Sequence, residues 1–299
     1  MTAETSENLL TIKAYAKINL YLDVISRYPD GYHQIISIMQ SVSLHDLLEV
    51  SDAPYPVIDV RCTEDALSGT TNLAYRAALE LRKQTGVKAG ASINIKKNIP
   101  IAAGLAGGSA DAAATLVGLD RLWGLNLSSE YLIEIASRIG ADVPFCLSGG
   151  TMLAGGKGEL LEPLAPLPDV SLVIATPPVP ISTAEVYRQF DEESAAALGK
   201  EQAMLSALSR GDIGSIADSL NNLLESVVLK RYPAVSETKD RALASGALAA
   251  LMSGSGPSVF ALCADEKSAL EVARAMRVDD DSFFIELVKP VSTGVEITH

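Results

Sequence analysis

The sequence is poor in the residues that form disulfides and bind transition metals. Its 299 residues include three cysteines and three histidines: Cys62, Cys146, Cys263, His33, His45 and His299. The cysteines are odd in number and widely separated, and these residues do not have the spacing of a metal site. We therefore expect a reducing compartment, the cytoplasm, and buried, unreactive thiols.

Positive charge and long apolar runs are also scarce. The 24 lysines and arginines are outnumbered by 37 aspartates and glutamates, which gives a net charge of −13 at pH 7. Such a surface repels nucleic acids and anionic lipids, whose binding needs clustered basic residues. No run of about 18 apolar residues could span a membrane, and the first residues lack the pattern of a signal peptide. We expect no nucleic-acid or membrane partner, whereas a small anionic ligand would need only a local positive site.

The overall composition, with 48% hydrophobic and 20% charged residues, is that of a globular protein. From Thr11 to Val24 apolar and polar residues alternate. The alternation predicts a half-buried strand, with Lys17 and Asn19 on its polar face. The turn signal Pro29-Asp30-Gly31 and the apolar run from Ile35 then predict a β-hairpin.

The rest of the chain mixes predicted helices and strands. Strands are expected over residues 91–99, 172–175, 248–252, 259–263 and 283–288. In the first half of the chain, helices are expected over residues 72–84, from the end of the loop at 100–111 to residue 123, and from Ser128 or Ser129 to Gly140. In the second half, we expect one helix over residues 183–190, two or three helices between residues 195 and 245, and one that begins at residue 266. Three prolines within residues 164–169 indicate a boundary between two domains, 1–165 and 166–299. Such a mixture is typical of the α+β class.

The strongest local signal is the glycine-rich loop Pro100–Asp111 between a strand and a helix. Glycines let the backbone approach a ligand closely, and the start of a helix presents unpaired N–H groups to phosphate. The loop is neither a Walker A motif nor a dinucleotide fingerprint, because its glycines are differently spaced. A phosphate site and a tight turn are equally good interpretations of the loop alone.

Further positions could carry chemistry, and each has an ordinary structural alternative. Lys17 could bind phosphate and keep a nearby carboxylate ionised, or be a solvated lysine. Asp142 could orient a hydroxyl and accept its proton, or bond within a turn. Because Val143 precedes a proline, we expect it to be extended and to fix the direction of this carboxylate. Tyr32 and His33 could stack on a planar ring, or decorate a hairpin end.

Two more segments and one aspartate are interpreted as structural. Gly155–Glu159 is interpreted as a plain hairpin turn, and Gly254–Ser258 as a turn between two strands. Asp111 is favourable near the start of a helix, where the helix dipole attracts negative charge.

The order and spacing of these blocks resemble those of the kinase superfamily named for galactose, homoserine, mevalonate and phosphomevalonate, the GHMP kinases. The blocks that carry the resemblance are Ala16–Leu20, Asp30–His33, Pro100–Ala113, Gly140–Phe145 and Met252–Pro257. The resemblance extends from about Ile12 to about Pro290. It implies the GHMP kinase fold: an N-terminal domain like the second domain of ribosomal protein S5, a ferredoxin-like C-terminal domain, and an active site between them.

The resemblance also implies a reaction and its residues. The γ-phosphoryl group of ATP, with Mg²⁺, would be transferred to a small molecule, a cytidine diphosphate-linked methylerythritol. Lys17 and Asp142 would be the catalytic pair. The ATP-binding residues would be Pro100, Ile101, Ala102, Ala103, Gly104, Leu105, Ala106, Gly107, Gly108, Ser109 and Ala110, with the Ser109 hydroxyl nearest to Mg²⁺. The substrate would contact Asn19, Tyr32, His33, Thr183 and Tyr187.

The glycine-rich loop departs from the family pattern at two positions. Ala106 and Ala110 stand where the family usually has glycine and serine. If residue 106 needs a positive φ, alanine there costs about 1–2 kcal/mol. We expect instead that the position tolerates a Cβ. Ala110 leaves Ser109 without a neighbouring hydroxyl.

Three alternatives stay open. A sister kinase for homoserine, mevalonate or a sugar would share the loop but would have no use for Tyr32 and His33. A catalytically silent member would bind a metabolite without turnover. A nucleic-acid-binding module is disfavoured by the net charge of −13. We expect a monomer or a weak homodimer.

Overall fold

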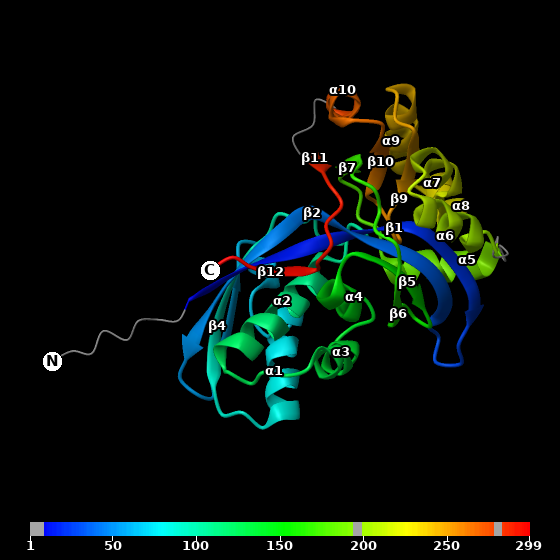
Figure 1. Cartoon of the computed structure of the whole chain (residues 1–299). Coiled ribbons are helices and arrows are strands. Elements are labelled where there is room, and N and C mark those ends of the chain that lie inside the picture. The colour runs from blue at the N-terminus through cyan, green and yellow to red at the C-terminus, as the bar shows by residue number, and fades with distance from the viewer. Residues whose placement is uncertain (1–8, 194–198, 278–282) are drawn as a thin grey trace.

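The computed structural model describes residues 9–193, 199–277 and 283–299, and contains two β-sheets, one above the other in Figure 1. The strands of the first sheet are β1 (Leu10–Arg27), β2 (His33–Ala53), β3 (Ile58–Cys62), β4 (Gly90–Lys96), β5 (Thr151–Gly155), β6 (Leu160–Pro163), β8 (Asn221–Asn222) and β12 (Val295–Ile297). Their order is β12-β1-β2-β4-β3, with β5 beside β2, β6 beside β5 and β8 beside β1.

β1 and β2 form the long hairpin that the alternation predicts. At its turn Gly31 has a φ of 89°, which glycine adopts without strain. The Asp30 side chain accepts the N–H of Tyr32 at 3.1 Å, the hydrogen bond of an Asx turn. The turn therefore forms for the physical reason on which the prediction was based: glycine accepts the positive φ, and the Asp30 side chain bonds to the backbone of the turn.

The prediction of a half-buried β1 is wrong for the middle of the strand. Lys17 and Asn19, on the polar face, are 4% and 3% exposed. Two loops cover this face: the Lys17 N–H donates to the carbonyl of Leu105 at 3.1 Å, and a Cβ on Gly254 would lie 3.3 Å from Lys17 Nζ. The alternation of residues within one strand does not show whether loops that are distant in the sequence cover its polar face.

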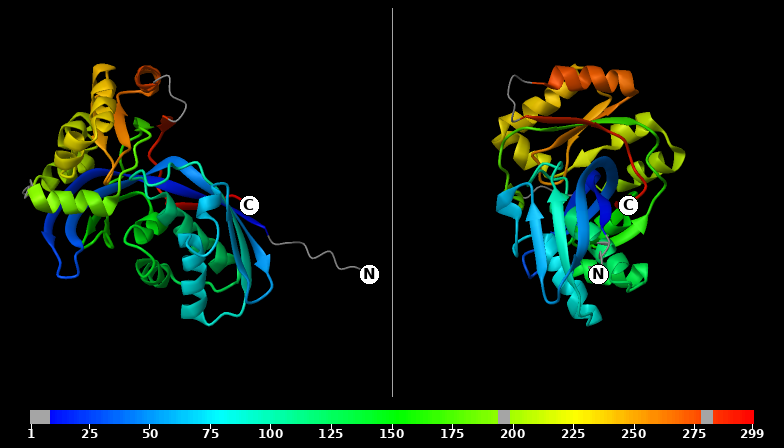
Figure 2. Two further views of the ribbon diagram at one scale, coloured as in Figure 1. Left: turned by 180° about the vertical axis from the view of Figure 1, so that it is seen from behind. Right: turned by 90° about the vertical axis from the view of Figure 1, so that its left-hand side faces the viewer.

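Four helices lie on the side of the first sheet that faces away from the second sheet (Figures 1 and 2): α1 (Leu73–Thr85), α2 (Gly107–Leu122), α3 (Ser129–Ser137) and α4 (Val143–Ser148). A 3-10 turn, η1 (Asp65–Leu67), precedes α1. The side chains of Asn72 and Ser128 accept N–H groups in the first turns of α1 and α3. α3 ends at Ser137, before the predicted end at Gly140, because residues 138–142 turn the chain into α4, and the Val143 N–H donates to the Gly140 carbonyl at 3.2 Å.

The second sheet has the predicted ferredoxin-like arrangement. Its strands are β7 (Ser171–Thr176), β9 (Ala249–Met252), β10 (Val259–Cys263) and β11 (Phe284–Val288), all antiparallel, in the order β11-β7-β10-β9. Counted along the chain this order is 4-1-3-2, that of a split βαβ sheet. The helices α9 (Pro233–Ala244) and α10 (Glu266–Met276) pack against it. The α+β class is confirmed.

More helices join the two sheets than the sequence predicts. They are α5 (Thr183–Glu193), α6 (Glu201–Arg210), α7 (Ile213–Ser219) and α8 (Glu225–Arg231). With α9, residues 199–245 hold four helices, not two or three, and residues 195–198 lie outside the described residues. Gly211, with a φ of 63°, and the capping Asp212 divide α6 from α7, and Pro233 begins α9. In the described ranges, we find no helix with the length and apolarity needed to cross a membrane.

The end of the chain returns from the second sheet to the first. After β11, residues 289–294 run along β2, and β12 pairs with β1 through Ile12↔Ile297 and Ala14↔Val295. The chain thus crosses between the two sheets at residues 164–170 and 289–294, and between these crossings it also touches the first sheet at β8. The division into domains 1–165 and 166–299 stays a prediction.

The three cysteines are buried and free. Burial raises the pKa of each thiol, that of Cys263 to about 11. A raised pKa disfavours the reactive thiolate, in agreement with the prediction of unreactive thiols.

Candidate active site

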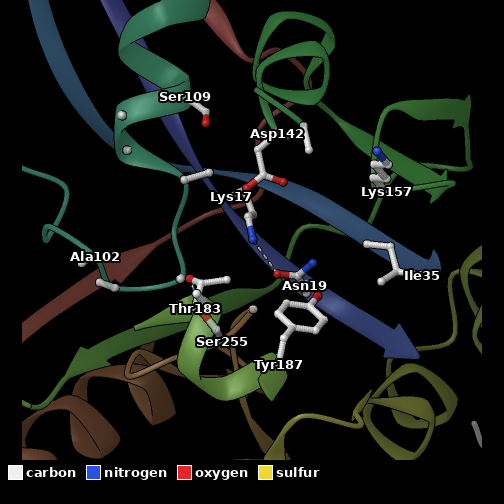
Figure 3. A pocket seen from close by; sticks show the side chains of 18 of the residues that line it. Lys17, Asn19, Ile35, Ala102, Ser109, Asp142, Lys157, Thr183, Tyr187 and Ser255 are labelled. Atoms are coloured by element: carbon white, nitrogen blue, oxygen red, sulfur yellow. Dashed lines mark hydrogen bonds between the residues drawn. The ribbon is translucent and has the colours of Figure 1, made fainter. Parts of the chain in front are cut away.

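A cleft of about 1240 Å³ lies between the two parts of the chain and gathers almost all predicted site residues. Its lining includes Lys17, Asn19, Tyr32, His33, Asp142, Thr183, Tyr187 and the loop from Pro100 to Ser109 without Leu105. Leu105 and Ala110 are buried behind the loop, 1% and 0% exposed. Figure 3 shows Ala102 and Lys157 on opposite sides of Lys17, which therefore lies near the middle of the cleft.

Lys17 is held in one direction by a chain of hydrogen bonds. Its Nζ donates to Asn19 Oδ1 at 2.7 Å, and Asn19 Nδ2 donates to Ser37 Oγ at 2.8 Å. Ser37 Oγ in turn donates to the Tyr21 carbonyl at 2.7 Å. Because an ammonium has three N–H donors, Lys17 can bind an anion in the cleft while it keeps its bond to Asn19.

Asp142 directly precedes α4 and points toward Lys17 (Figure 3). The expectation that Val143 is extended is wrong, because it is the first residue of α4 and Pro144 the second. Proline is accepted there because the first helical N–H groups have no partner within the helix. Tyr187 lines the same cleft from α5, and burial raises the pKa of its phenol.

The glycine-rich loop is fastened to the loop between β9 and β10. Gly104 has a φ of 77°, and a Cβ there would lie only 2.1 Å from the Ser253 carbonyl oxygen. Ser253 Oγ donates to the Gly104 carbonyl at 2.9 Å. The segment Gly254–Ser258, interpreted from the sequence as a turn, also helps to hold the loop in place, because the Ser258 N–H donates to the Ala103 carbonyl at 3.3 Å.

The loop leads into α2 through Ala106, which has a φ of 57° and a ψ of 27°. Alanine has no side-chain oxygen that could accept the first N–H groups of the helix. Gly107 and Gly108, which follow, put no side chain between these N–H groups and the cleft. The start of α2 thus has the features of an anion site.

The left-handed conformation of Ala106 corrects the expectation that this position tolerates a Cβ without strain. Replacing Ala106 with glycine should raise the free energy of unfolding by about 1 kcal/mol, because the left-handed region costs a non-glycine residue roughly that amount. Urea denaturation of the two proteins measures the difference. Ala203, exposed in α6, is a matched control: Ala203→Gly should destabilise by about 0.5–1 kcal/mol. Equal losses in both variants would contradict the prediction.

On the side of the cleft away from the loop, aromatic and charged side chains meet. The His33 and Tyr187 rings stack with centroids 4.7 Å apart. His33 Nε2 lies 2.7 Å from Asp191 Oδ1, and Arg27 lies 3.1 Å from the other oxygen of this carboxylate. Thr183 Oγ1 and Ser255 Oγ are 2.8 Å apart, which links α5 to the loop after β9.

Lys157 is a cleft residue that sequence reasoning missed. Gly155–Glu159 is the predicted hairpin turn, between β5 and β6, but Lys157 lines the cleft. Its Nζ lies 2.5 Å from Asp30 Oδ2 and 4.4 Å from the centre of the Tyr32 ring. The one signal in the sequence is a lysine at the tip of a glycine-rich hairpin, and such a lysine is usually only solvated.

A buried ion cluster lies below the glycine-rich loop, and it too was missed. Lys97 Nζ pairs with Asp46 and, at 2.7 Å, with Asp111 Oδ2. Burial and the nearby charge of Asp46 raise the pKa of Asp111, although Lys97 opposes the shift. Asp111, interpreted from the sequence as a structural residue at a helix start, thus also pairs with Lys97, and both residues line the cleft.

The donor atoms of the cleft suit Mg²⁺ that is held mainly by ATP. Among the described residues, no group of three or more histidines, cysteines, aspartates or glutamates could hold a metal ion. Mg²⁺ commonly binds to substrate phosphates with few protein ligands, all of them oxygens. The Ser109 hydroxyl, at the start of α2, lines the cleft and is such an oxygen.

Comparisons with known proteins agree with this architecture. Two family models match the chain: GHMP kinases N terminal domain over residues 72–150, and GHMP kinases C terminal over residues 204–278. The 4-diphosphocytidyl-2-C-methyl-D-erythritol kinase of Pelotomaculum thermopropionicum is 49% identical over 278 residues, 93% of this chain and 97% of that protein. The kinase of the same name from a Synechococcus species is 42% identical over 297 residues, 95% of each chain.

Solved structures show the same relationship. A crystal structure of 4-(cytidine 5'-diphospho)-2C-methyl-D-erythritol kinase aligns with a TM-score of 0.78 at 35% identity, over 93% of this chain and 99% of that one. Homoserine kinase from Cytophaga hutchinsonii aligns with a TM-score of 0.81 at 20% identity, over 99% of both chains. The second likeness is one of fold alone.

Proposed function

The chain belongs to the GHMP kinase family, and we propose that it phosphorylates the 2-hydroxyl of 4-diphosphocytidyl-2-C-methyl-D-erythritol with ATP. The reaction is a step of isoprenoid precursor biosynthesis by the non-mevalonate pathway. The observation that supports this most is the content of one cleft, which holds an anion site, a lysine with an aspartate, and a group of aromatic side chains. We further propose a cytoplasmic monomer or weak homodimer.

The phosphates of ATP bind in this proposal to the loop Pro100–Ala110 and the start of α2. Backbone N–H groups and the helix dipole favour negative charge there. Ser109 would hold Mg²⁺ together with the phosphate oxygens, and the bound ion supplies neutralisation of phosphate charge. Leu105 and Ala110 support the loop from behind.

The transfer itself uses Asp142 and Lys17. Asp142 orients the 2-hydroxyl in line with the γ-phosphorus and takes its proton as the new O–P bond forms. The bond to the β–γ bridging oxygen breaks, and ADP leaves with the electron pair. Lys17, directed by Asn19, stabilises the charge that develops on the transferred group.

The cytidine binds at the opposite side of the cleft, against Tyr32 and His33. Tyr32 offers an exposed ring on which a base can stack. Asp191 accepts the Nε2 proton of His33, which leaves Nδ1 as an acceptor for the amino group of cytosine. Tyr187 and Thr183 contact the substrate from α5.

The test is ADP release by the purified protein with Mg-ATP and three acceptors: the cytidine compound, homoserine and mevalonate. We expect turnover with the cytidine compound alone, since the other two have no base to occupy the Tyr32–His33 side. Turnover with another acceptor would retain the phosphate site and the catalytic pair but contradict the substrate. ATP binding without turnover would instead favour a catalytically silent, metabolite-binding member.

A further inference from the structure

The C-terminal segment lies between β1 and α4 and touches the backbone of both. The Tyr15 N–H of β1 donates to the Gly294 carbonyl at 3.0 Å. On the other side, a Cβ on Gly294 would lie 1.8 Å from the Cys146 carbonyl oxygen in α4. A Cβ on Gly149, directly after α4, would lie 1.9 Å from the Gly294 nitrogen. Gly294 thus lies between the strand and the helix in close backbone contact with both.

These two elements carry the proposed catalytic pair. Lys17 is two residues beyond Tyr15 on β1, and Asp142 directly precedes α4, of which Cys146 is the fourth residue. Because α4 has only six residues, a displacement at its end moves its start as well. The spacing of Lys17 and Asp142 therefore depends on what lies between β1 and α4.

The segment is fixed along β1 as well as at residue 294. β12 pairs with β1, and Glu296 accepts hydrogen bonds from Tyr15 Oη and from Lys13 Nζ. Gly294 itself has a φ outside the left-handed region. Glycine is therefore required there by the close contact with Cys146, and not by its backbone conformation.

We propose that Gly294 is a positioning residue for phosphoryl transfer, which sets the separation between the strand that carries Lys17 and the helix that carries Asp142. The inference rests on the proposed roles of these two side chains. A side chain at residue 294 would push α4 away from β1, whereas the phosphate loop would keep its hydrogen bonds from the Lys17 N–H on β1 and from Ser253 Oγ.

Gly294→Ala tests this directly. We expect kcat to fall about 10- to 100-fold, since a misplacement of the order of 1 Å costs that much. The Kd of Mg-ATP, measured by calorimetry without acceptor, should stay within about twofold. Gly124 is a matched control: it has a φ of 63° and nothing within 4 Å of an added Cβ. Gly124→Ala should lower the melting temperature and leave kcat unchanged, which separates positioning from stability.

A double-mutant cycle decides whether the effect passes through Asp142. In an Asp142→Asn background, Gly294→Ala should lower kcat by less than about twofold, because the base it displaces is already absent. Full multiplication of the two losses, or wild-type kcat in Gly294→Ala, would overturn the inference. If Gly294→Ala does not fold, Glu296→Gln loosens the same segment without a clash and should show a smaller, equally non-additive loss. A wild-type protein without turnover on any acceptor would contradict the proposed function itself, and the inference with it.

Discussion

Replacing Asp142 with asparagine is expected to lower kcat roughly 10²- to 10⁴-fold, which is the usual contribution of a positioned base. Asparagine keeps the size and the hydrogen-bonding shape of the side chain, but its amide cannot accept the proton of the substrate hydroxyl. In the described part of the chain the Asp142 side chain does not cap α4, so the substitution should leave folding intact. Steady-state kinetics with saturating Mg-ATP measure the loss.

The control for Asp142→Asn is Asp120→Asn. The Asp120 carboxylate accepts the N–H of Leu127 at 3.0 Å near the end of α2 and does not line the cleft. Its replacement should reduce stability slightly and leave kcat as in the wild type. A folded Asp142→Asn protein with wild-type turnover would show that the hydroxyl proton leaves by another route.

Replacing Lys17 with alanine is expected to cost about 10²- to 10³-fold in kcat, as for one lost electrostatic contact in a water-poor site. Lys17 is 4% exposed and its ammonium is directed by Asn19, and a water molecule in the space left by alanine would bring no positive charge. Because alanine also removes buried packing, Lys17→Met should be measured beside it. Similar losses in both variants would assign the effect to the charge.

The control for Lys17 is Lys83→Ala, a surface lysine of α1 with 71% of its side chain exposed. This variant changes the net charge by the same amount and should keep wild-type kcat and KM. If Lys17→Met turned over like the wild type, the role of Lys17 in stabilising the transferred phosphoryl group would be wrong.

Local signals predicted the elements whose geometry depends on their own residues. The Asp30–Gly31 turn and the helix starts near residue 72 and at Ser128 or Ser129 were predicted. In each case a side chain, that of Asp30, Asn72 or Ser128, bonds to nearby backbone. The rule that the residue before a proline is extended failed at Val143, because a proline in the first turn of a helix loses no hydrogen bond. The three-residue strand β12 could not be predicted, since it is defined by its partner β1.

The sequence predicted which residues form the candidate site better than it predicted which side chains contact one another there. The resemblance supplied Lys17, Asp142 and the loop, whereas each residue alone was ambiguous. Lys157 and the Lys97 cluster were missed, because the partners of Lys157 and Lys97 lie far away in the sequence: Asp30 is 127 residues from Lys157, and Asp46 is 51 residues from Lys97. Ion pairs of this kind become visible only when the fold brings the strands together.

The two crossings of the chain between the sheets, at residues 164–170 and 289–294, are reinforced by β8, which pairs with β1 through Tyr21↔Asn221 and Leu22↔Asn222. The far end of the β1–β2 hairpin shares a hydrophobic cluster with the second sheet and its helices, to which it contributes Leu22, Val24 and Ile35. One proteolytic cut within residues 164–170 would leave the halves linked through residues 289–294. A fragment that ends at residue 165 would lack β12 and expose the edge of β1.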